Sequence, residues 1–589
     1  MLTEECKSLK EKFQQIKNID KTSNEYNKHL KCKSDENQRE LGDNENYSLY
    51  PHLDDVKFNE KIHIKKEFND VRYETKSPED FDNIIEISNK ICNSKEFELE
   101  PHQMFVRNFL SFQTPYNGLL LFHGLGTGKT CSSISVCEEM RRYNKQLGIT
   151  KKIIIVASPA VQENFKIQLF DERKLNEANG YWNIKACTGN NFLKEINPMN
   201  MKGLSRKKVQ NQIKKIIKLS YSFFGYIEFS NYLKKVMNKE INEMDDETVI
   251  RIKQGRAIKK EFSNRMIVID EIHNLRVSSK GSKAQIKPTS KNIEKLVIYS
   301  ENLKMMILSA TPMFNTHTEI IWLLNILNMN DNRFTIREDE VFDGRGNFLE
   351  SDMPGLGKEL LIQKARGYIS YVRGENPFTF PNRIWPKYSR NENSLLIKKE
   401  TGLWNYPENQ LNGAKIMEPI EILDLVTVNV GEVQIDIYNR LIEYLKKENP
   451  SLIESKKNIG FTKLEAPLQC LNMAYPYNNI DNEDGKDITL CYGKKGLDRL
   501  MLYKPKTKSN FRYKDETLRE YGRIFSPGEI GKYSGKIKSI CDYIKKSKGL
   551  VFVFSQYIDS GLIPMALALE EMGFTRYGFA SHTKSLFAD

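Results

Sequence analysis

Short aliphatic runs recur along the chain from about residue 97 onward, and each is followed by a stretch with helical periodicity. The five clearest runs occupy residues 119–122, 153–157, 266–269, 305–308 and 550–554. Continuous apolar strands that alternate with helices are typical of a parallel sheet covered on both faces. The pattern therefore predicts an α/β fold built on parallel sheets.

Polar stretches divide the chain into candidate domains. Residues 1–95 are rich in Lys, Glu, Asn and Asp, have sparse apolar periodicity, and predict a polar, loosely ordered leader. A first sheet lobe is expected over residues 96–330, with a Lys-rich helical insertion at about 190–262. A bridging or insertion region with the start of a second lobe is expected over 331–530, and the remainder of the second lobe over 531–589.

Composition narrows the setting in which the protein works. No apolar run approaches the roughly 20 residues of a membrane span, and the first residues lack the hydrophobic core of a secretory signal. The nine cysteines are scattered, so we expect reduced thiols in an intracellular protein and no zinc site. The formal net charge of +13 suits a polyanionic partner without identifying one.

The first candidate site is HGLGTGKT at residues 123–130, between a predicted strand and a predicted helix. Lys129 can place its charge at the β and γ phosphates of a nucleotide, and the Thr130 hydroxyl can bind Mg²⁺. The remaining cofactor-binding positions are those whose backbone N–H groups can face phosphate oxygens: Gly124, Gly126, Thr127 and Gly128. A chance glycine-rich turn is the alternative, and the strand–loop–helix context makes it the weaker one.

The second candidate site is the Asp-Glu-Ile-His sequence that ends the apolar run beginning at Met266. A carboxylate at the tip of a buried strand suits a metal, so Asp270 is predicted to hold Mg²⁺. Glu271 is predicted to be the base that orients the attacking water, and His273 to be a relay contact. Ordinary acidic capping of a strand is the alternative, which the phosphate loop about 140 residues earlier weakens.

Three smaller motifs complete the set. Ser309 and Thr311 follow the run at 305–308 and are predicted to couple the nucleotide site to a facing lobe. Gln103, about twenty residues before the phosphate loop, can pair with an adenine edge, the alternative being a solvated glutamine at a helix start. The Lys-rich stretch 206–219 could add charge toward nucleic acid, but a solvated amphipathic surface helix is the favoured interpretation.

In this order the blocks resemble superfamily 2 motors of the Swi/Snf-like branch, which are helicases of the DEAD/DEAH type. LEPHQ is similar to the adenine motif, HGLGTGKT to motif I, residues 153–169 to motif Ia, DEIH to motif II, SATP to motif III, and residues 532–557 to the segment that ends at motif IV. The phosphate loop departs from the strict pattern at His123, as such motors commonly do. Phrases such as VIDEIHNLR and LSATPMFNTHTEIIWLLNILN resemble helicases of large cytoplasmic DNA viruses, similar to the poxvirus early transcription factor small subunit and nucleoside triphosphate phosphohydrolase I.

The resemblance implies two RecA-like P-loop lobes and ATP hydrolysis, with Mg²⁺, coupled to movement on DNA in viral transcription. RNA is the alternative to DNA as the nucleic acid, and strand separation is the alternative to translocation. Motif Ia grips the backbone in this family, which implies nucleic-acid contacts at Ser158, Pro159 and Ala160. RNA polymerase or other transcription factors are the implied protein partners, and the host cytoplasm or the virion is the implied location.

The resemblance also implies an incomplete second lobe. After VFVFSQY the family continues to motif V and to motif VI, Gln-x-x-Gly-Arg-x-x-Arg, whereas here Asp589 follows Gln556 by 33 positions and neither motif appears. Such arginines accelerate phosphoryl transfer by about 10³–10⁵, so the chain alone is expected to be catalytically incomplete. A non-hydrolysing scaffold or binding subunit of a transcription complex is the alternative, which the intact lysine and carboxylates of motifs I and II disfavour.

Overall fold

A six-stranded parallel sheet forms the centre of the first of two compact units, Met1–Pro381. The order is β5-β2-β6-β7-β1-β8 and every neighbouring pair is parallel. The strands are β1 (Gly118–His123), β2 (Ile153–Val156), β5 (Tyr221–Phe224), β6 (Met266–Asp270), β7 (Lys304–Ser309) and β8 (Ile369–Val372). The predicted α/β fold with a parallel sheet is therefore confirmed.

The structure is a computed structural model, and it describes most but not all residues of the chain. The described residues are 4–16, 19–43, 49–73, 82–93, 98–184, 186–198, 203–275, 288–313, 316–344, 346–349, 356–372, 408, 425–448, 461–478, 486–505, 507–576 and 585–588. None of the helices within these ranges is both long and apolar enough to cross a membrane.

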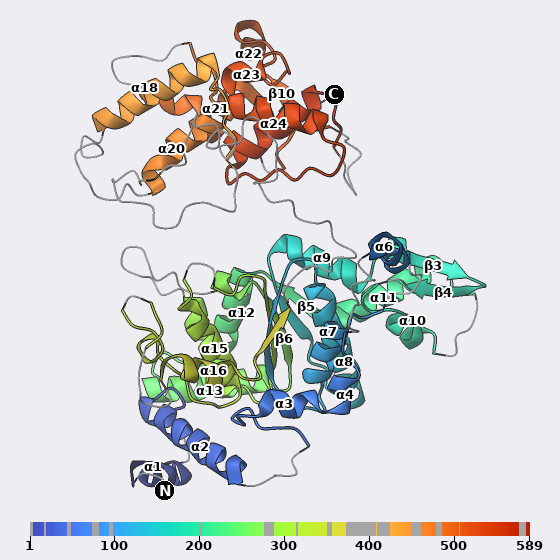
Figure 1. The fold of residues 1–589 in the computed structure, drawn as a ribbon, viewed down its shortest axis with the longest axis vertical. Coiled ribbons are helices and arrows are strands. Elements are labelled where there is room, and N and C mark those ends of the chain that lie inside the picture. Colours follow the sequence, from blue (N-terminus) through green and yellow to red (C-terminus); the bar gives the residue numbers. More distant parts are fainter. Residues whose placement is uncertain are drawn as a thin grey trace. The chain divides into compact units, whose positions relative to one another are not determined.

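Helices cover both faces of the sheet, as continuous apolar strands require. In Figure 1, α7 (Pro101–Phe109) and α8 (Lys129–Gln146) lie on one side of the strands. The other side carries α12 (Tyr226–Met237), α13 (Glu247–Phe262), α15 (Glu319–Asn330) and α16 (Gly357–Ala365), while α14 (Pro288–Tyr299) packs against α13 and α15. β1, β2, β6 and β7 are almost wholly buried in the resulting core.

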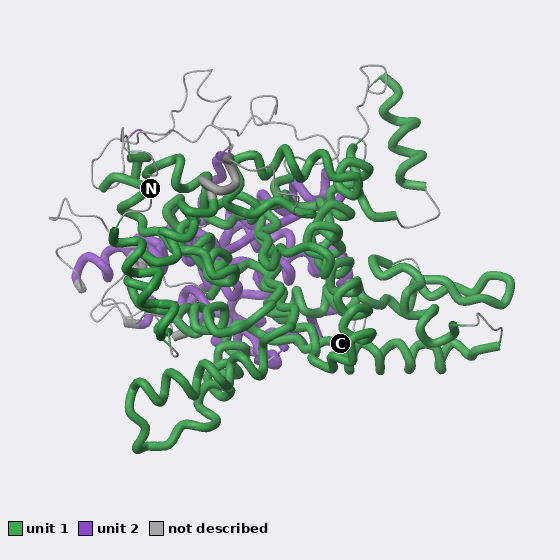
Figure 2. Tube along the Cα trace, turned by 90° about the horizontal axis from the view of Figure 1, so that it is seen from below, with its two compact units in different colours: residues 1–381 green, residues 382–589 purple. Residues whose placement is uncertain are grey.

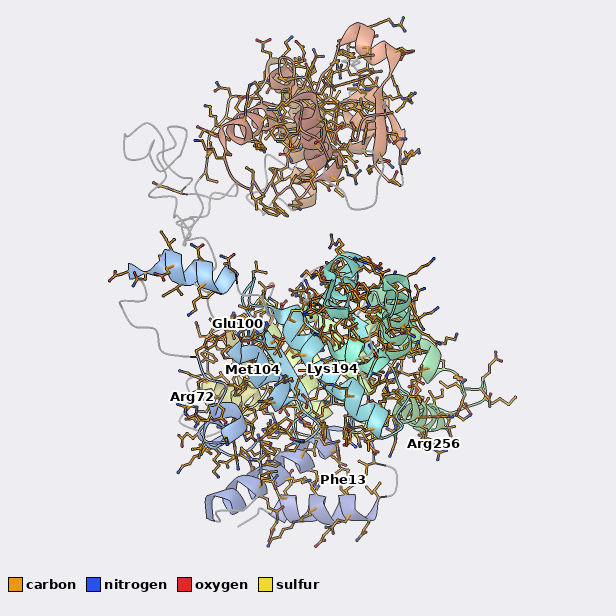
Figure 3. All side chains as sticks on the ribbon, turned by 90° about the vertical axis from the view of Figure 1, so that its right-hand side faces the viewer. Phe13, Arg72, Glu100, Met104, Lys194 and Arg256 are labelled. Carbon is orange, nitrogen blue, oxygen red and sulfur yellow. A yellow bond between two sulfur atoms is a disulfide. The ribbon has the colours of Figure 1, made fainter. Side chains whose placement is uncertain are left out.

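The segment predicted as a loosely ordered leader contains packed structure. Its helices are α1 (Glu4–Gln15), α2 (Asn24–Asp43), α3 (Phe58–His63), α4 (Lys66–Asn69) and α6 (Ile84–Cys92). Phe13, labelled in Figure 3, is buried in the α1–α2 hairpin with its ring centroid 5.5 Å from that of Tyr26. Phe58 and Phe68 join the main core of the unit. These sparse aromatic anchors fall too far apart in sequence to produce the periodicity that signals a packed helix.

The chain segment that connects β2 to β5 forms a small subdomain. It projects from the sheet at the right of Figure 2. After α9 (Pro159–Leu169) it comprises β3 (Leu175–Ala178), β4 (Tyr181–Ile184), α10 (Asn191–Ile196) and α11 (Arg206–Ser220). Its own apolar core includes Phe170, Phe192, Val209 and Ile213. The described insertion thus lies earlier than the predicted 190–262, because α12 and α13 belong to the covering of the sheet. In α11 Val209 and Ile213 are buried and the lysines are exposed, as the amphipathic interpretation expected.

The second unit, Asn382–Asp589, is mainly helical where it is described. Its elements are α18 (Glu432–Glu448), α20 (Phe461–Asn472), α21 (Gly493–Leu500), α22 (Asp515–Glu520), α23 (Ile530–Tyr533), α24 (Gly535–Lys546), α25 (Ile563–Glu571) and an antiparallel pair of β9 (Met501–Lys504) with β10 (Ser509–Tyr513).

The prediction of a buried strand at residues 550–554 is wrong. This segment forms no ladder, and Phe552 and Phe554 are 89% and 80% exposed. A strand exists only with a hydrogen-bonded neighbour, and no described residue of this unit pairs with the segment.

Candidate nucleotide and metal site

The predicted phosphate and hydrolysis motifs meet at one edge of the sheet. HGLGTGKT follows β1, the acidic pair follows β6, and Ser309 ends β7, which lies between those two strands. Because the strands are parallel, their carboxyl ends lie at the same edge, where open α/β sheets bind ligands. Motifs separated by about 140 to 180 residues in sequence are thereby brought together.

The phosphate loop has the backbone that its glycines allow. Gly126 and Gly128 have φ values of 79° and 78°, in the left-handed region that favours glycine. A Cβ at Gly128 would lie 2.3 Å from Nε2 of Gln103, so a side chain there would also clash. Lys129 opens α8, and its ammonium donates to the carbonyl oxygens of His123 and Gly124 at 2.9 and 3.2 Å. The lysine thus points back over the loop that should cradle a phosphate.

The charges at the strand ends act on one another. Burial lowers the pKa of Lys129, and the carboxylates of Glu271 and Asp270 oppose that effect. Burial, followed by the charge of Glu271, raises the pKa of Asp270 to about 6, while Lys129 acts in the opposite direction. The lysine and both carboxylates therefore belong to one electrostatic cluster.

Glu271 is held in place from two sides. The Ser309 hydroxyl donates to its Oε2 at 2.7 Å, and Nδ1 of His273 lies 3.3 Å from the same oxygen. Glu271 has a φ of 45°, unusual for a residue with a side chain and a form of strain that clusters at functional sites. Thr311 contributes its backbone N–H, which donates to the Ser309 hydroxyl at 3.0 Å. The predicted base and the predicted coupling residues are therefore in contact.

Gln103 supports the phosphate loop. Its side chain is 5% exposed, and its Nε2 donates to the carbonyl oxygens of Thr127 and Gly128 at 3.4 and 3.3 Å. Its Oε1 accepts from the backbone N–H of Glu100 at 3.0 Å. The solvated alternative for Gln103 is therefore wrong, while its contact with adenine stays a prediction. The neighbouring His102, which the motif analysis passed over, also binds the loop, with Nε2 2.8 Å from the oxygen of Thr127.

The predicted nucleic-acid contacts lie at the tip of β2. Ser158 precedes α9 with an extended backbone, and Pro159 is the first residue of the helix. Pro159 and Ala160 are exposed, and Ser158 is half-buried. The position is open to a phosphate backbone on the same edge of the sheet as the nucleotide motifs.

Tyr226 is a residue of this site that the sequence analysis did not single out. It is the first residue of α12, directly after β5, and its hydroxyl donates to the backbone oxygen of Asp270 at 3.0 Å. Nδ2 of Asn274 donates to the same hydroxyl at 3.4 Å. Its place in YSFFGYIEFSNYL, just past a strand end, was the available signal.

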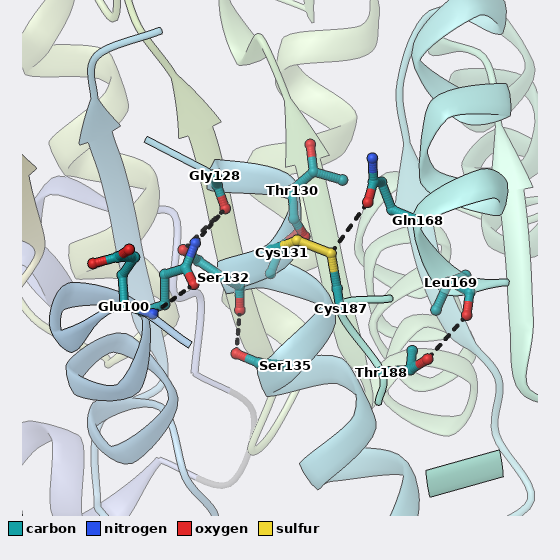
Figure 4. Close-up of a disulfide and its surroundings, with 12 residues drawn as sticks. Glu100, Gly128, Thr130, Cys131, Ser132, Ser135, Gln168, Leu169, Cys187 and Thr188 are labelled. Atoms are coloured by element: carbon teal, nitrogen blue, oxygen red, sulfur yellow. Dashed lines mark hydrogen bonds between the residues drawn. A yellow bond between two sulfur atoms is a disulfide. The ribbon is translucent and has the colours of Figure 1, made fainter. Parts of the chain in front are cut away.

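Two disulfides overturn the expectation of reduced thiols for four of the nine cysteines, while the other five are free. Cys131, directly after Thr130, is bonded to Cys187, with Cα atoms 5.2 Å apart (Figure 4). Cys6 and Cys32 join α1 to α2. The partners are 56 and 26 residues apart in sequence, so only the fold reveals that they are neighbours. The first bond ties the beginning of the phosphate-loop helix to the segment that follows β4.

Breaking the Cys131–Cys187 bond is expected to lower the free energy of unfolding by about 2–4 kcal/mol, because the closed loop restricts the unfolded chain. The measurement is urea unfolding of a Cys6→Ser/Cys32→Ser variant with and without dithiothreitol. Adding Cys131→Ser and Cys187→Ser should abolish the response to the reductant. Equal stability of the variant before and after reduction would contradict a stabilising role.

Comparison with known proteins agrees with the motifs. The family described as SNF2-related domain matches residues 25–335, just over half of the chain. Two putative ATP-dependent RNA helicases of Acanthamoeba polyphaga mimivirus are 28% and 24% identical over 57% and 85% of this chain. An early transcription factor large subunit homolog of African swine fever virus is 20% identical over 49% of it.

The chain spans only part of some relatives, covering 28% and 68% of the two mimivirus proteins and 29% of the African swine fever virus protein. The family match takes in motifs I, Ia, II and III, and the fold brings motifs I, II and III to one sheet edge. This chain belongs to the SNF2-related family.

Proposed function

We propose that the protein is an ATP-driven nucleic-acid motor that binds ATP with Mg²⁺ and hydrolyses it to move along DNA. The observation that carries the proposal is the meeting of Lys129, Asp270 and the Ser309-bound Glu271 at one edge of a parallel sheet. A structural protein would have no need for a strained carboxylate residue beside a half-buried lysine.

The donors at this edge fit a magnesium nucleotide. Thr130 supplies a hydroxyl and Asp270 a carboxylate, the oxygen ligands that Mg²⁺ prefers. Gly124, Gly126 and Gly128 carry no side chains, so the backbone N–H groups of the loop can approach phosphate oxygens at the beginning of α8. When bound, the metal would neutralise charge on the phosphates. Lys129 would add its charge there, and Glu271 would orient and deprotonate the attacking water.

The nucleic acid is proposed to run along the tip of β2, over Ser158, Pro159 and Ala160. Family membership favours DNA, while the names of the mimivirus relatives keep RNA as the alternative. A role in viral transcription, with RNA polymerase or other transcription factors as partners and the host cytoplasm or virion as the location, draws on the viral relatives.

The direct test is ATP turnover by the protein with and without duplex DNA. We expect DNA to raise ATP affinity and to accelerate ATP hydrolysis in a form of the protein that includes motif VI, whereas residues 1–589 alone should hydrolyse ATP barely and respond little to DNA. Tight ATP binding that duplex DNA and single strands both leave unchanged, together with no hydrolysis, would favour the scaffold alternative.

Affinity for duplex DNA is expected to fall at least about tenfold between roughly 50 and 200 mM salt. Each phosphate contact contributes a slope of about −0.9 in the logarithm of affinity against that of salt, so two contacts suffice. Fluorescence anisotropy with a labelled duplex measures this, and a duplex of scrambled sequence should bind equally well. Affinity that does not change with salt would exclude a motor that grips the backbone.

A further inference from the structure

The Tyr226 hydroxyl stands where the predicted DNA and nucleotide sites approach each other. This hydroxyl donates to the backbone oxygen of Asp270 and accepts from Nδ2 of Asn274. In the sheet β2 lies between β5 and β6, so the side chain of Tyr226, which begins the helix after β5, crosses the tip of β2 to reach the tip of β6. Burial raises the pKa of Tyr226, and the contacts from Asn274 and Ser158 oppose that effect. One side chain therefore links the tip of β5 to the tip of β6 across the tip of β2, where Ser158 lies.

The neighbours of Tyr226 extend this connection to the predicted base. Asn274 also donates to the backbone oxygen of Glu271, at 3.1 Å. On the other side, Ser158 precedes the first turn of α9, and the N–H of Ala157 donates to the oxygen of Phe224 at 3.0 Å. The β2 and β5 tips are therefore linked by backbone, whereas the tyrosine hydroxyl joins them to the acidic motif.

We propose that the Tyr226 hydroxyl is a positioning group that couples DNA binding at Ser158 to nucleotide binding at Asp270 and Glu271. A phosphate contact that shifts the Ser158 backbone moves the β2 tip that this side chain crosses, and with it the hydrogen bond from the hydroxyl to the Asp270 carbonyl. The inference rests on the proposed function, because it requires both ligands to bind at the sites assigned above.

The contribution of the Tyr226 hydroxyl can be tested separately from that of its ring. The ring packs against the main core of the first unit, and Tyr226→Phe keeps the ring while removing the bridging oxygen. Tyr232 provides a matched control on the same helix. Its hydroxyl donates to Oε1 of Glu261 at 2.6 Å and has no contact with either motif. Tyr232→Phe thus removes one tyrosine hydroxyl from α12 without touching the connection.

The test is the dissociation constant of a non-hydrolysable ATP analogue with Mg²⁺, measured with and without a saturating duplex DNA. The ratio of the two constants is the coupling factor, which is typically about 5 to 150 between coupled sites. We expect Tyr226→Phe to bring this factor close to one while each ligand alone binds within about threefold of the unchanged protein. Tyr232→Phe should keep the original factor.

Each other outcome decides against a specific claim. An unchanged factor in Tyr226→Phe, or an equal loss in both variants, overturns the role of this hydroxyl. If the unchanged protein binds both ligands independently, there is no coupling to transmit and the inference fails while ATP and DNA binding stand. If the unchanged protein does not bind the analogue or the duplex at all, the proposed function itself fails.

Discussion

Hydrolysis of bound ATP is expected to slow by about 10²- to 10⁴-fold when Glu271 is replaced by glutamine, the range for losing a positioned general base. Glutamine has nearly the same shape, and its Oε1 can still accept the hydrogen bond that the Ser309 hydroxyl donates at 2.7 Å. The variant should therefore keep its affinity for ATP and Mg²⁺. Single-turnover hydrolysis of labelled ATP, with protein in excess, measures the ratio of the two rates even where both are slow.

Two further substitutions serve as a control for a lost carboxylate and as a test of the metal-binding role of Asp270. Glu163→Gln on α9 removes an exposed carboxylate that pairs with Lys166, and should leave the hydrolysis rate unchanged. Asp270→Asn should instead weaken the dependence of ATP binding on Mg²⁺. If Glu271→Gln and Asp270→Asn lost nucleotide binding to the same extent, the division of roles between the two carboxylates would be wrong.

Replacing Lys129 by alanine is expected to weaken ATP binding by about 10- to 100-fold, because a hydrogen bond to a charged group contributes about 1.5–3 kcal/mol. The lysine opens α8, and its amine is held over the phosphate loop by two carbonyl oxygens. Its loss also leaves Asp270 and Glu271 without the positive charge that acts on them. Titration with a fluorescent ATP analogue measures the change, and hydrolysis should fall further than binding.

Lys145→Ala is the matched control, since this residue lies in the last turn of the same helix. Its ammonium pairs with Glu195 at 2.8 Å, and its side chain is 65% exposed. The two substitutions remove the same charge from α8, one at the phosphate loop and one at the far end of the helix. Similar ATP affinities for both variants would reject the assignment of residues 123–130 as the phosphate loop.

The strands that could be predicted are those in which consecutive residues are apolar because both faces of the strand are buried. Helices cover both faces of four strands, β1, β2, β6 and β7. Each of these strands is therefore a mainly aliphatic run that can be recognised from the sequence alone. At the sheet edges, β5 and β8 mix aromatic, hydroxyl and aliphatic residues and are only partly buried. Segment 550–554 has the same aliphatic character as the central strands but no partner among the described residues. Apolar sequence indicates a tendency to pair, and pairing depends on a second segment.

The candidate site shows the same division. Glycines, a lysine and adjacent carboxylates at strand ends could be identified because their chemistry depends on local spacing. Tyr226 and the Cys131–Cys187 bond could not be identified, because each depends on distant segments meeting in the fold. Gln103 lies between these cases, since its motif marked it and its contacts with the loop needed the structure.

The separate core of the β3–β4 and α10–α11 subdomain has a consequence for amide hydrogen exchange. Phe192, Val209 and Ile213 pack in a cluster distinct from that of the sheet, whereas Cys187 belongs to the core of the sheet. Local units with small cores open more often than the body that bears them. The backbone amide hydrogens of α10 and α11 should therefore exchange through local opening. Those of β6 and β7 should exchange only when the whole sheet unfolds. The disulfide at Cys187 would keep such an opening from spreading to the phosphate-loop helix.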